Sequence, residues 1–250
     1  MSSTKGRKKL RRLLENDRTW NAYAIADLDP VHDEFTDWYL HKDSILLRYR
    51  GLEPDLIFAS GDPTVIESLF SELPPDNYQY ALKEEVFDVV LRRTSDDPSI
   101  LMWRMMHKPD PLNFVMPDVV QVLSIEDLPN IELLMADHKD RPDSFMPAQL
   151  ATGQFFGVYK SHDLIAMAGV HVCSEISSVA AVGNVFTHPE YRGKGFGTLT
   201  STAVINKLRG QGIQTIVLNV SKENEAAIRA YSKVGFEFYC QYLEGTCRIP

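Results

Sequence analysis

Residues 184–198 read Asn-Val-Phe-Thr-His-Pro-Glu-Tyr-Arg-Gly-Lys-Gly-Phe-Gly-Thr, and this stretch decides the fold. A predicted strand ends in a turn, glycines alternate with other residues at Gly193, Gly195 and Gly197, and a helix is predicted over 197–209. Without a Cβ in the way, the backbone amides of such a loop can all turn toward one ligand. Together with the positive end of the helix dipole, these amides favour a phosphate or pyrophosphate.

Two familiar phosphate-binding loops do not fit this stretch. A P-loop requires Gly-Lys followed by Ser or Thr, whereas Lys194 is followed by Gly195. A dinucleotide-binding loop requires a third glycine three residues after the second, and that position is Thr198. A tight turn that binds no ligand is the plain structural alternative. The loop therefore needs support from a second element.

The second element lies where a predicted strand over 215–220 leads into a predicted helix over 223–234. Asn224, Ala227 and Tyr231 fall at i, i+3 and i+7, which places them on one helix face. An amide, a small residue and a phenol make a poor core stripe but a suitable wall for an elongated ligand. The structural alternative is an ordinary core tyrosine at Tyr231.

The remaining pattern extends outward from these two elements. Strands are predicted over 119–123, 155–160, 164–173, 179–187 and 236–242, and a helix begins at 124–127. The predicted order is strand, helix, three strands, helix, strand, helix, strand. It is an α/β arrangement, and the apolar run over 215–220 is typical of a strand buried on both faces.

The first 115 residues predict a smaller α/β unit. Asp62 and Pro63 have the character of a helix start, because aspartate is a good cap and proline fits the first helical position. Helices are predicted over 9–16 and 19–26, strands over 44–50, 55–59, 78–82 and 87–92, and a strand or short helix over 102–106. Closely spaced prolines near residue 115 predict a domain boundary there, which divides the chain into 1–115 and 116–250.

Composition and charge exclude several classes of protein. The net charge of -8 argues against broad nucleic-acid binding, which needs a positive face. The apolar runs are too short to span a bilayer, and we expect no membrane partner. Cys173, Cys240 and Cys247 show no metal-type spacing, so we expect no metal and a reducing, cytoplasmic location. The basic residues before Leu13 predict a surface helix, with a mitochondrial transit peptide as the alternative.

The stretch from about 119 to 242 resembles the GNAT acetyltransferase superfamily. Residues 192–197 fit its Arg/Gln-x-x-Gly-x-Gly/Ala pyrophosphate motif, and residues 224–236 fit its Asn-x-x-Ala-x-x-x-Tyr-x-x-x-Gly-Phe signature. Residues 184–192 further resemble the glycine-N-acyltransferase-like branch. The resemblance implies a mixed, mostly antiparallel sheet flanked by helices. It also allows residues 1–115 to be a degenerate GNAT-like half, which binds no CoA because residues 60–63 lack the repeated glycines.

The resemblance implies that acetyl-CoA lies between two strands that separate, those predicted over 179–187 and 215–220. The residues expected to contact it are Val185, Phe186, Thr187, Arg192, Gly193, Lys194, Gly195, Phe196, Gly197, Thr198, Asn219, Asn224, Ala227 and Tyr231. Among these, the first three would pair with the pantetheine arm, and the glycine loop would hold the pyrophosphate.

The implied reaction is direct attack of a primary amine on the thioester, with Tyr231 as the general acid for the leaving thiolate. The general base stays open between His171, whose residue type titrates near neutral pH, Glu175, and a site that binds a neutral amine without a base. Two other functions stay open: a glycine N-acyltransferase-like enzyme that uses a longer acyl-CoA, and an inactive CoA-binding module. The amine is unidentified, and we expect a monomer or a homodimer.

Overall fold

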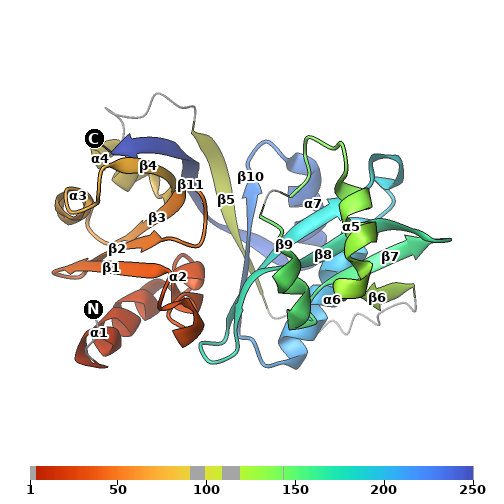
Figure 1. Ribbon diagram of the computed structural model, residues 1–250, viewed down its shortest axis with the longest axis horizontal. Helices are drawn as coiled ribbons and strands as arrows, with labels where there is room; N and C mark the ends of the chain where they lie inside the picture. Colours follow the sequence, from red (N-terminus) through yellow and green to blue (C-terminus); the bar gives the residue numbers. More distant parts are fainter. Residues whose placement is uncertain (1–3, 91–98, 109–118, 143, 250) are drawn as a thin grey trace. The chain divides into compact units, whose positions relative to one another are not determined.

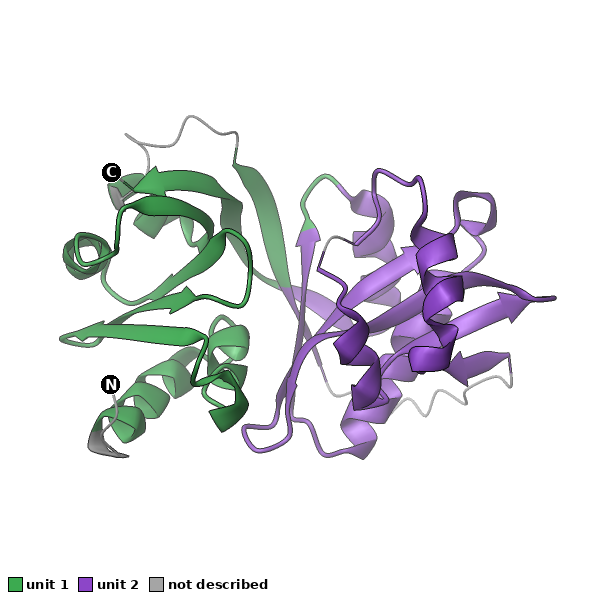
Figure 2. Cartoon of the chain, in the orientation of Figure 1, with its two compact units in different colours: residues 1–104, 221–223, 239–250 green, residues 105–220, 224–238 purple. Residues whose placement is uncertain are grey.

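The computed structural model describes residues 4–90, 99–108, 119–142 and 144–249 (Figure 1). The chain forms two compact units. The first contains residues 1–104, 221–223 and 239–250, and the second contains residues 105–220 and 224–238 (Figure 2). The boundary predicted near residue 115 lies outside the described residues. Three strands, β5 (Ile100–His107), β10 (Thr215–Ser221) and β11 (Phe236–Ile249), have residues in both units.

The first unit is built around a mostly antiparallel sheet. Its strands run in the order β1-β2-β3-β4-β11, and only the β3–β4 pair is parallel. The strands up to β4 are β1 (Thr36–His41), β2 (Ser44–Tyr49), β3 (Asp55–Ser60) and β4 (Asp76–Leu82). The helices are α1 (Thr4–Leu14), α2 (Ala22–Ala26), α3 (Pro63–Phe70) and α4 (Glu84–Val90), with 3₁₀ turns at η1 (Glu15–Asp17) and η2 (Pro30–His32). Apolar side chains of β2, β3, α3 and β4 form its core.

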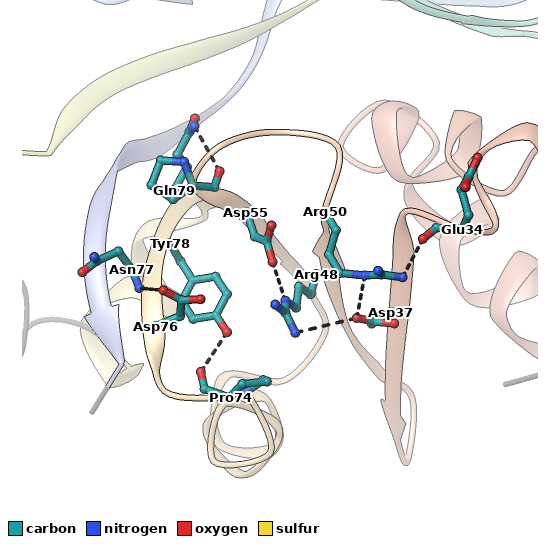
Figure 3. A network of polar contacts seen from close by, with 11 residues as sticks. Glu34, Asp37, Arg48, Arg50, Asp55, Pro74, Asp76, Asn77, Tyr78 and Gln79 are labelled. Carbon is teal, nitrogen blue, oxygen red and sulfur yellow. Dashed lines mark hydrogen bonds and ion pairs between the residues drawn. The ribbon is translucent and has the colours of Figure 1, made fainter.

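A polar network ties the outer strands of the first unit together (Figure 3). Arg48 on β2 lies between β1 and β3, where its Nε is 2.6 Å from Asp55 and its terminal nitrogen is 3.9 Å from Asp37. Arg50 adds a second ion pair to Asp37, at 3.1 Å. These contacts join three neighbouring strands, β1, β2 and β3. We therefore interpret the network as one that stabilises the sheet.

Two elements of the first unit differ from the sequence prediction. Residues 87–92 were expected as a strand, but the chain forms α4 over Glu84–Val90, and residues 91 and 92 lie outside the described part. The β-branched valines favour a strand, yet Glu84 and Glu85 lie in the first helical turn, where negative charge is favourable. Strand β1 was not expected, because its partly exposed residues lack a clear apolar alternation. The capped start of α3 at Asp62 and Pro63 is confirmed.

The second unit follows the predicted order of elements. Its sheet runs β10-β9-β8-β7-β6, with the β10–β9 pair parallel and the other pairs antiparallel. Helices α5 and α6 lie on opposite faces of this sheet (Figure 1), which explains the nearly continuous burial of β8 and β9. The elements are β6 (Val120–Val122), η3 (Ile125–Asp127), α5 (Leu128–Met135), η4 (Pro147–Thr152), β7 (Phe156–Lys160), β8 (Asp163–Ser174), β9 (Val179–Thr187), η5 (Pro189–Tyr191), α6 (Phe196–Gly210), β10 (Thr215–Ser221) and α7 (Glu225–Lys233), followed by β11.

The two units share one order of elements. The first runs β1, β2, β3, α3, β4, α4, β5, and the second runs β7, β8, β9, α6, β10, α7, β11. In each, a helix connects two parallel neighbouring strands, β3–α3–β4 and β9–α6–β10. The predicted mixed, mostly antiparallel sheet flanked by helices is confirmed.

Candidate active site

The glycine loop joins β9 to α6 and leaves the start of this helix without a side-chain cap. Gly193 has φ +74° and Gly195 has φ +86°, a region that favours glycine. Gly195 is the N-cap of α6, and it offers no side chain to accept a hydrogen bond from the first amides of the helix. A Cβ at either glycine would meet nothing within 4 Å, so the surface beside the loop is open. The first amides of α6 can therefore serve a ligand.

Gly197 allows the first turn of α6 to approach the end of β9. A Cβ at this position would lie 3.4 Å from Oγ1 of Thr187 and 4.0 Å from Cγ1 of Val185. The loop, the helix start and the last residues of β9 therefore form one continuous surface.

Both cations at the rim of the loop have partners within the protein. The Nε of Arg192 donates to the Thr187 carbonyl at 2.9 Å, its guanidinium lies over the ring of Phe186, and its terminal nitrogen is 2.8 Å from a carboxylate oxygen of Asp140. The Nζ of Lys194 donates to the Glu190 carbonyl at 2.9 Å. An anion bound to Arg192 would therefore compete with Asp140.

Strands β9 and β10 separate at their carboxyl ends. Their parallel pairing ends with Leu218 opposite Val182. Beyond it, β9 continues through Val185 to Thr187, of which Phe186 and Thr187 pair with β8 on the other side, and β10 continues from Asn219. The edge of β9 that faces β10 is thus available from residue 183 to 187, where an extended chain can bind as an added strand.

A bulge distorts β9 at the point of separation. Opposite β8, the register shifts between Phe186 and Gly183, and Asn184 takes φ +52°. A second shift in the β8–β9 register, between Val170 and Val172, gives β8 an extra residue at His171. Bulges of this kind redirect side chains and backbone groups locally.

His171 lies beside this bulge and contacts the backbone of β9. Its Nε2 is 3.0 Å from Oγ of Ser144 and accepts a hydrogen bond from the Asn184 amide at 3.3 Å. Gln149 binds both strands, because its amide nitrogen donates to the His171 carbonyl and its oxygen accepts from Nδ2 of Asn184. Asn184 is buried, and its Oδ1 has no hydrogen-bond partner among the described residues. These four polar side chains form a cluster at the point where the strands separate.

Helix α7 begins beside the end of β10. Asn224 is its N-cap, and Oδ1 of Asn224 accepts from the Ala227 amide at 3.0 Å. The predicted helix over 223–234 was therefore too long at its start, and Asn224 precedes the helix face that carries Ala227 and Tyr231. Asparagine caps a helix well because its side chain replaces the missing acceptor of the first turn.

Tyr231 is half-buried on α7. Its ring packs edge-on against Phe236, with 6.1 Å between the centroids, and its hydroxyl makes no hydrogen bond to any residue in the described part of the chain. Burial raises the pKa of Tyr231 to about 12. The phenol therefore keeps its proton at neutral pH and can donate it.

Glu175 lies at the opposite end of β9 from the glycine loop. Its carboxylate accepts from the side-chain amide of Gln211 at 2.7 Å, and Gln211 follows the last turn of α6. The glycine loop precedes the first turn of that helix, so the two ends are separated by its full length of 15 residues, about 22 Å. The structure thus groups His171, and not Glu175, with the point where β9 and β10 separate.

Sequence reasoning did not single out Ser144, Gln149, Asn184, Gly183 or Asp140. A glycine inside a strand pattern, as at Gly183, indicates a bulge or a close backbone approach, and that signal was present. The other four residues carry no local signal, because their contacts join segments far apart in the sequence.

No group of three or more His, Cys, Asp or Glu residues in the described ranges could hold a metal ion. Among the helices with described residues, none combines the length and apolar character needed to cross a membrane.

Part of the chain is similar to known acetyltransferases. Residues 122–236 match the sequence model of the acetyltransferase (GNAT) family. N-acetyltransferase YobR of Bacillus subtilis (strain 168) is 34% identical over 82 residues, which are 33% of this chain and 32% of that protein. Mycothiol acetyltransferase of Paenarthrobacter aurescens (strain TC1) is 33% identical over 109 residues, 43% of this chain and 31% of that protein. The chain thus spans about a third of the length of these relatives.

Solved structures extend the likeness of fold to most of the chain. An acetyltransferase from the GNAT family of Novosphingobium aromaticivorans has a TM-score of 0.65 at 22% identity, over 92% of this chain and 97% of that one. This similarity includes residues ahead of position 122, which the family model does not reach.

Proposed function

We propose that the chain, whose residues 122–236 match the sequence model of the acetyltransferase (GNAT) family, transfers an acetyl group from acetyl-CoA to a primary amine. The observation that carries this proposal is the separation of β9 from β10 after Val182 and Leu218, directly ahead of an uncapped, glycine-rich helix start. An open strand edge that leads to an anion site suits a long ligand with a pyrophosphate in its middle.

The residues present fit acetyl-CoA as a substrate. Backbone amides from Gly193 to Thr198, including that of Phe196, are suited to the pyrophosphate, with Arg192 and Lys194 at the rim. The free edge of β9 over 183–187 is suited to the pantetheine arm. Asn219, Asn224 and Ala227 line the ends of β10 and α7 on the other side.

In the proposed reaction, the neutral amine attacks the thioester carbonyl, the new C–N bond forms, and the C–S bond breaks. Tyr231 donates its proton to the leaving thiolate as general acid. A phenol with a pKa of about 12 is fully protonated before the reaction, and its hydroxyl is not engaged by a described residue. His171 is the preferred general base, because it lies at the point of strand separation, while Glu175 binds Gln211 elsewhere.

A second candidate is a glycine N-acyltransferase-like enzyme that uses a longer acyl-CoA. The shared element order of the two units favours it, because the resemblance of residues 184–192 pointed to a branch in which some members have two such halves. Parallel assays with acetyl-CoA and with longer acyl-CoAs distinguish the two candidates by the chain length that gives the higher kcat/KM.

We further propose that the domain of residues 1–115 is a degenerate half that binds no CoA. Helix α3 connects two parallel strands of the first unit, as α6 does in the second unit. However, the first backbone amides of α3 already have a hydrogen-bond acceptor. The Asp62 carboxylate accepts from the amides of Thr64 and Val65, at 2.8 Å and 3.3 Å. A carboxylate at this position also repels a pyrophosphate.

The test is a screen of small amines and peptides with acetyl-CoA, followed by release of free thiol and by mass detection of the acetylated product. We expect amine-dependent thiol release, which the Gly195→Asp variant loses. Calorimetric binding of CoA without turnover of any amine would instead support the inactive CoA-binding module.

A further inference from the structure

We propose that the hydroxyl of Ser144 is the group that takes the proton from the incoming ammonium ion and passes it to His171. This inference rests on the proposed acetyl transfer and adds a catalytic residue to it. Ser144 lies on the segment between α5 and η4, 27 residues before His171, and its Oγ is 3.0 Å from Nε2 of that ring.

The hydrogen bonds of His171 define the direction of transfer. The backbone amide of Asn184 can only donate, so Nε2 acts as an acceptor at 3.3 Å. The Ser144 hydroxyl therefore directs its own proton at the same nitrogen. The two donors share the single lone pair of Nε2, and of the two only the hydroxyl can take a proton from a substrate while it passes its own to the ring.

The position of the pair matches the end of the proposed acyl-CoA site. The edge of β9 is free only between residues 183 and 187, because β10 covers it up to Val182. The acyl end of a bound chain must therefore lie near Gly183 and Asn184. His171 lies against both of them, because a Cβ at Gly183 would come within 2.2 Å of its ring and the Asn184 amide donates to its Nε2.

Ser144 is held in place on its C-terminal side. Phe145 packs edge-on against Phe155, with 5.8 Å between the ring centroids. The amide of Met146 donates to Oε1 of Gln149, and Nε2 of the same side chain donates to the His171 carbonyl. Ser144 itself is half-buried, so its hydroxyl remains within reach of a substrate. A hydroxyl fixed by its neighbours needs little reorganisation during transfer.

The proposed steps balance in protons and bonds. The ammonium gives one proton to Oγ of Ser144, while the hydroxyl proton of Ser144 moves to Nε2 of His171. The neutral amine then forms the C–N bond, and Tyr231 protonates the sulfur as the C–S bond breaks. The nitrogen of the intermediate loses its second proton, which restores the phenol. His171 releases its proton to solvent, so one proton leaves per acetyl group transferred.

The experiment compares Ser144→Ala and Ser144→Thr with the parent in steady-state acetyl transfer, with the best amine from the screen. We expect kcat to fall by about 100-fold in Ser144→Ala, at the low end of general acid–base effects, with KM for acetyl-CoA unchanged. Ser144→Thr keeps a hydroxyl and should recover most of the rate. The defect of Ser144→Ala should shrink as the pH approaches the pKa of the amine, because less ammonium then needs to lose a proton. Ser144, Gln149 and the Asn184 side chain carry no charge and do not titrate in that range.

Ser68→Ala is the matched control, since Ser68 is exposed on α3 and its hydroxyl binds only the local Val65 carbonyl. Thermal unfolding and CoA affinity are measured for every variant. An active parent with an equally active Ser144→Ala variant overturns the relay but leaves the acetyltransferase proposal intact. A Ser144→Thr variant no better than Ser144→Ala, a defect that is constant with pH, or an acetylated Ser144 formed without amine also overturns it. A parent that releases no thiol with any amine overturns the proposed function itself.

Discussion

The imidazole of His171 lies directly on the Cα of Gly183. A Cβ at residue 183 would come within 2.2 Å of both Cδ2 and Nε2 of that ring. No side chain larger than hydrogen fits there unless the ring moves. The glycine thus sets the position of His171 across the β8–β9 pair, at the point where β9 leaves β10.

Gly183→Ala should displace the His171 ring and lower acetyl transfer, while CoA binding is retained because the glycine loop is unchanged. We expect a loss in kcat of about 100-fold if His171 is the base. The measurement pairs steady-state kinetics with CoA titration. Gly210→Ala is the control, because a Cβ there meets nothing within 4 Å. Unchanged kcat in Gly183→Ala would remove His171 from the mechanism.

Tyr231→Phe should keep the fold and the affinity for CoA, because the ring that packs against Phe236 remains. Loss of the general acid should lower the rate of the chemical step by about 10²–10⁴-fold. Single-turnover acetyl transfer measures this step without product release. A rate within about twofold of the parent would contradict the effect expected for a general acid and make Tyr231 a structural residue.

Gly195→Asp should abolish CoA binding, because a carboxylate at the start of α6 repels a pyrophosphate and strains a backbone at φ +86°. Gly212→Asp is a matched control. Gly212 has φ +81°, a Cβ there also meets nothing within 4 Å, and it lies beyond the other end of α6. Isothermal titration with CoA separates the two variants. Equal loss of affinity in both would assign the effect to backbone strain, and retained affinity in Gly195→Asp would refute the loop as the anion site.

CoA should bind with a stoichiometry of one per chain, because the start of α3 is already capped by Asp62 while the start of α6 has no side-chain cap. Removing the cap with Asp62→Ala should lower the free energy of unfolding without adding a second site. Calorimetry gives the stoichiometry and urea unfolding gives the stability. Two equal sites in the parent would rule out a degenerate first half.

Asp27→Asn should remove a pH dependence of stability. Burial, and to a lesser extent the nearby Asp29, raises the pKa of Asp27 to about 8 in the folded chain. The unfolded chain releases this proton near pH 4 while the native state holds it, so the parent loses stability as the pH rises from about 4 to about 8. At pH 8 the variant should be more stable than the parent by at least about 1 kcal/mol, and at pH 4 nearly equal. Urea unfolding at both pH values measures this, with the exposed Asp43→Asn as control. If the difference in unfolding free energy between variant and parent is the same at pH 4 and at pH 8, Asp27 does not hold a proton in the folded chain.

The sequence alone determined the elements around the glycine loop. Strand β9 has the predicted bounds of 179–187, and α6 begins within one residue of its predicted start. The signals there are local: a β-rich run that ends in a turn, and glycines at positions whose φ is positive. Gly235, after α7, has φ +91°, a backbone conformation that glycine readily adopts at the end of a helix.

Tertiary structure alone decided the elements and contacts that local chemistry leaves undetermined. The valine-rich segment of α4 has strand propensity but becomes a helix, and Val86 packs into the core of the first unit. Strand β1 exists because β2 offers it an antiparallel edge. The contacts of His171 with Ser144 and with the backbone of Asn184 join residues 27 and 13 positions apart. They form only because two register shifts bring a bulged residue of each strand together, and pairing register depends on packing across the whole sheet.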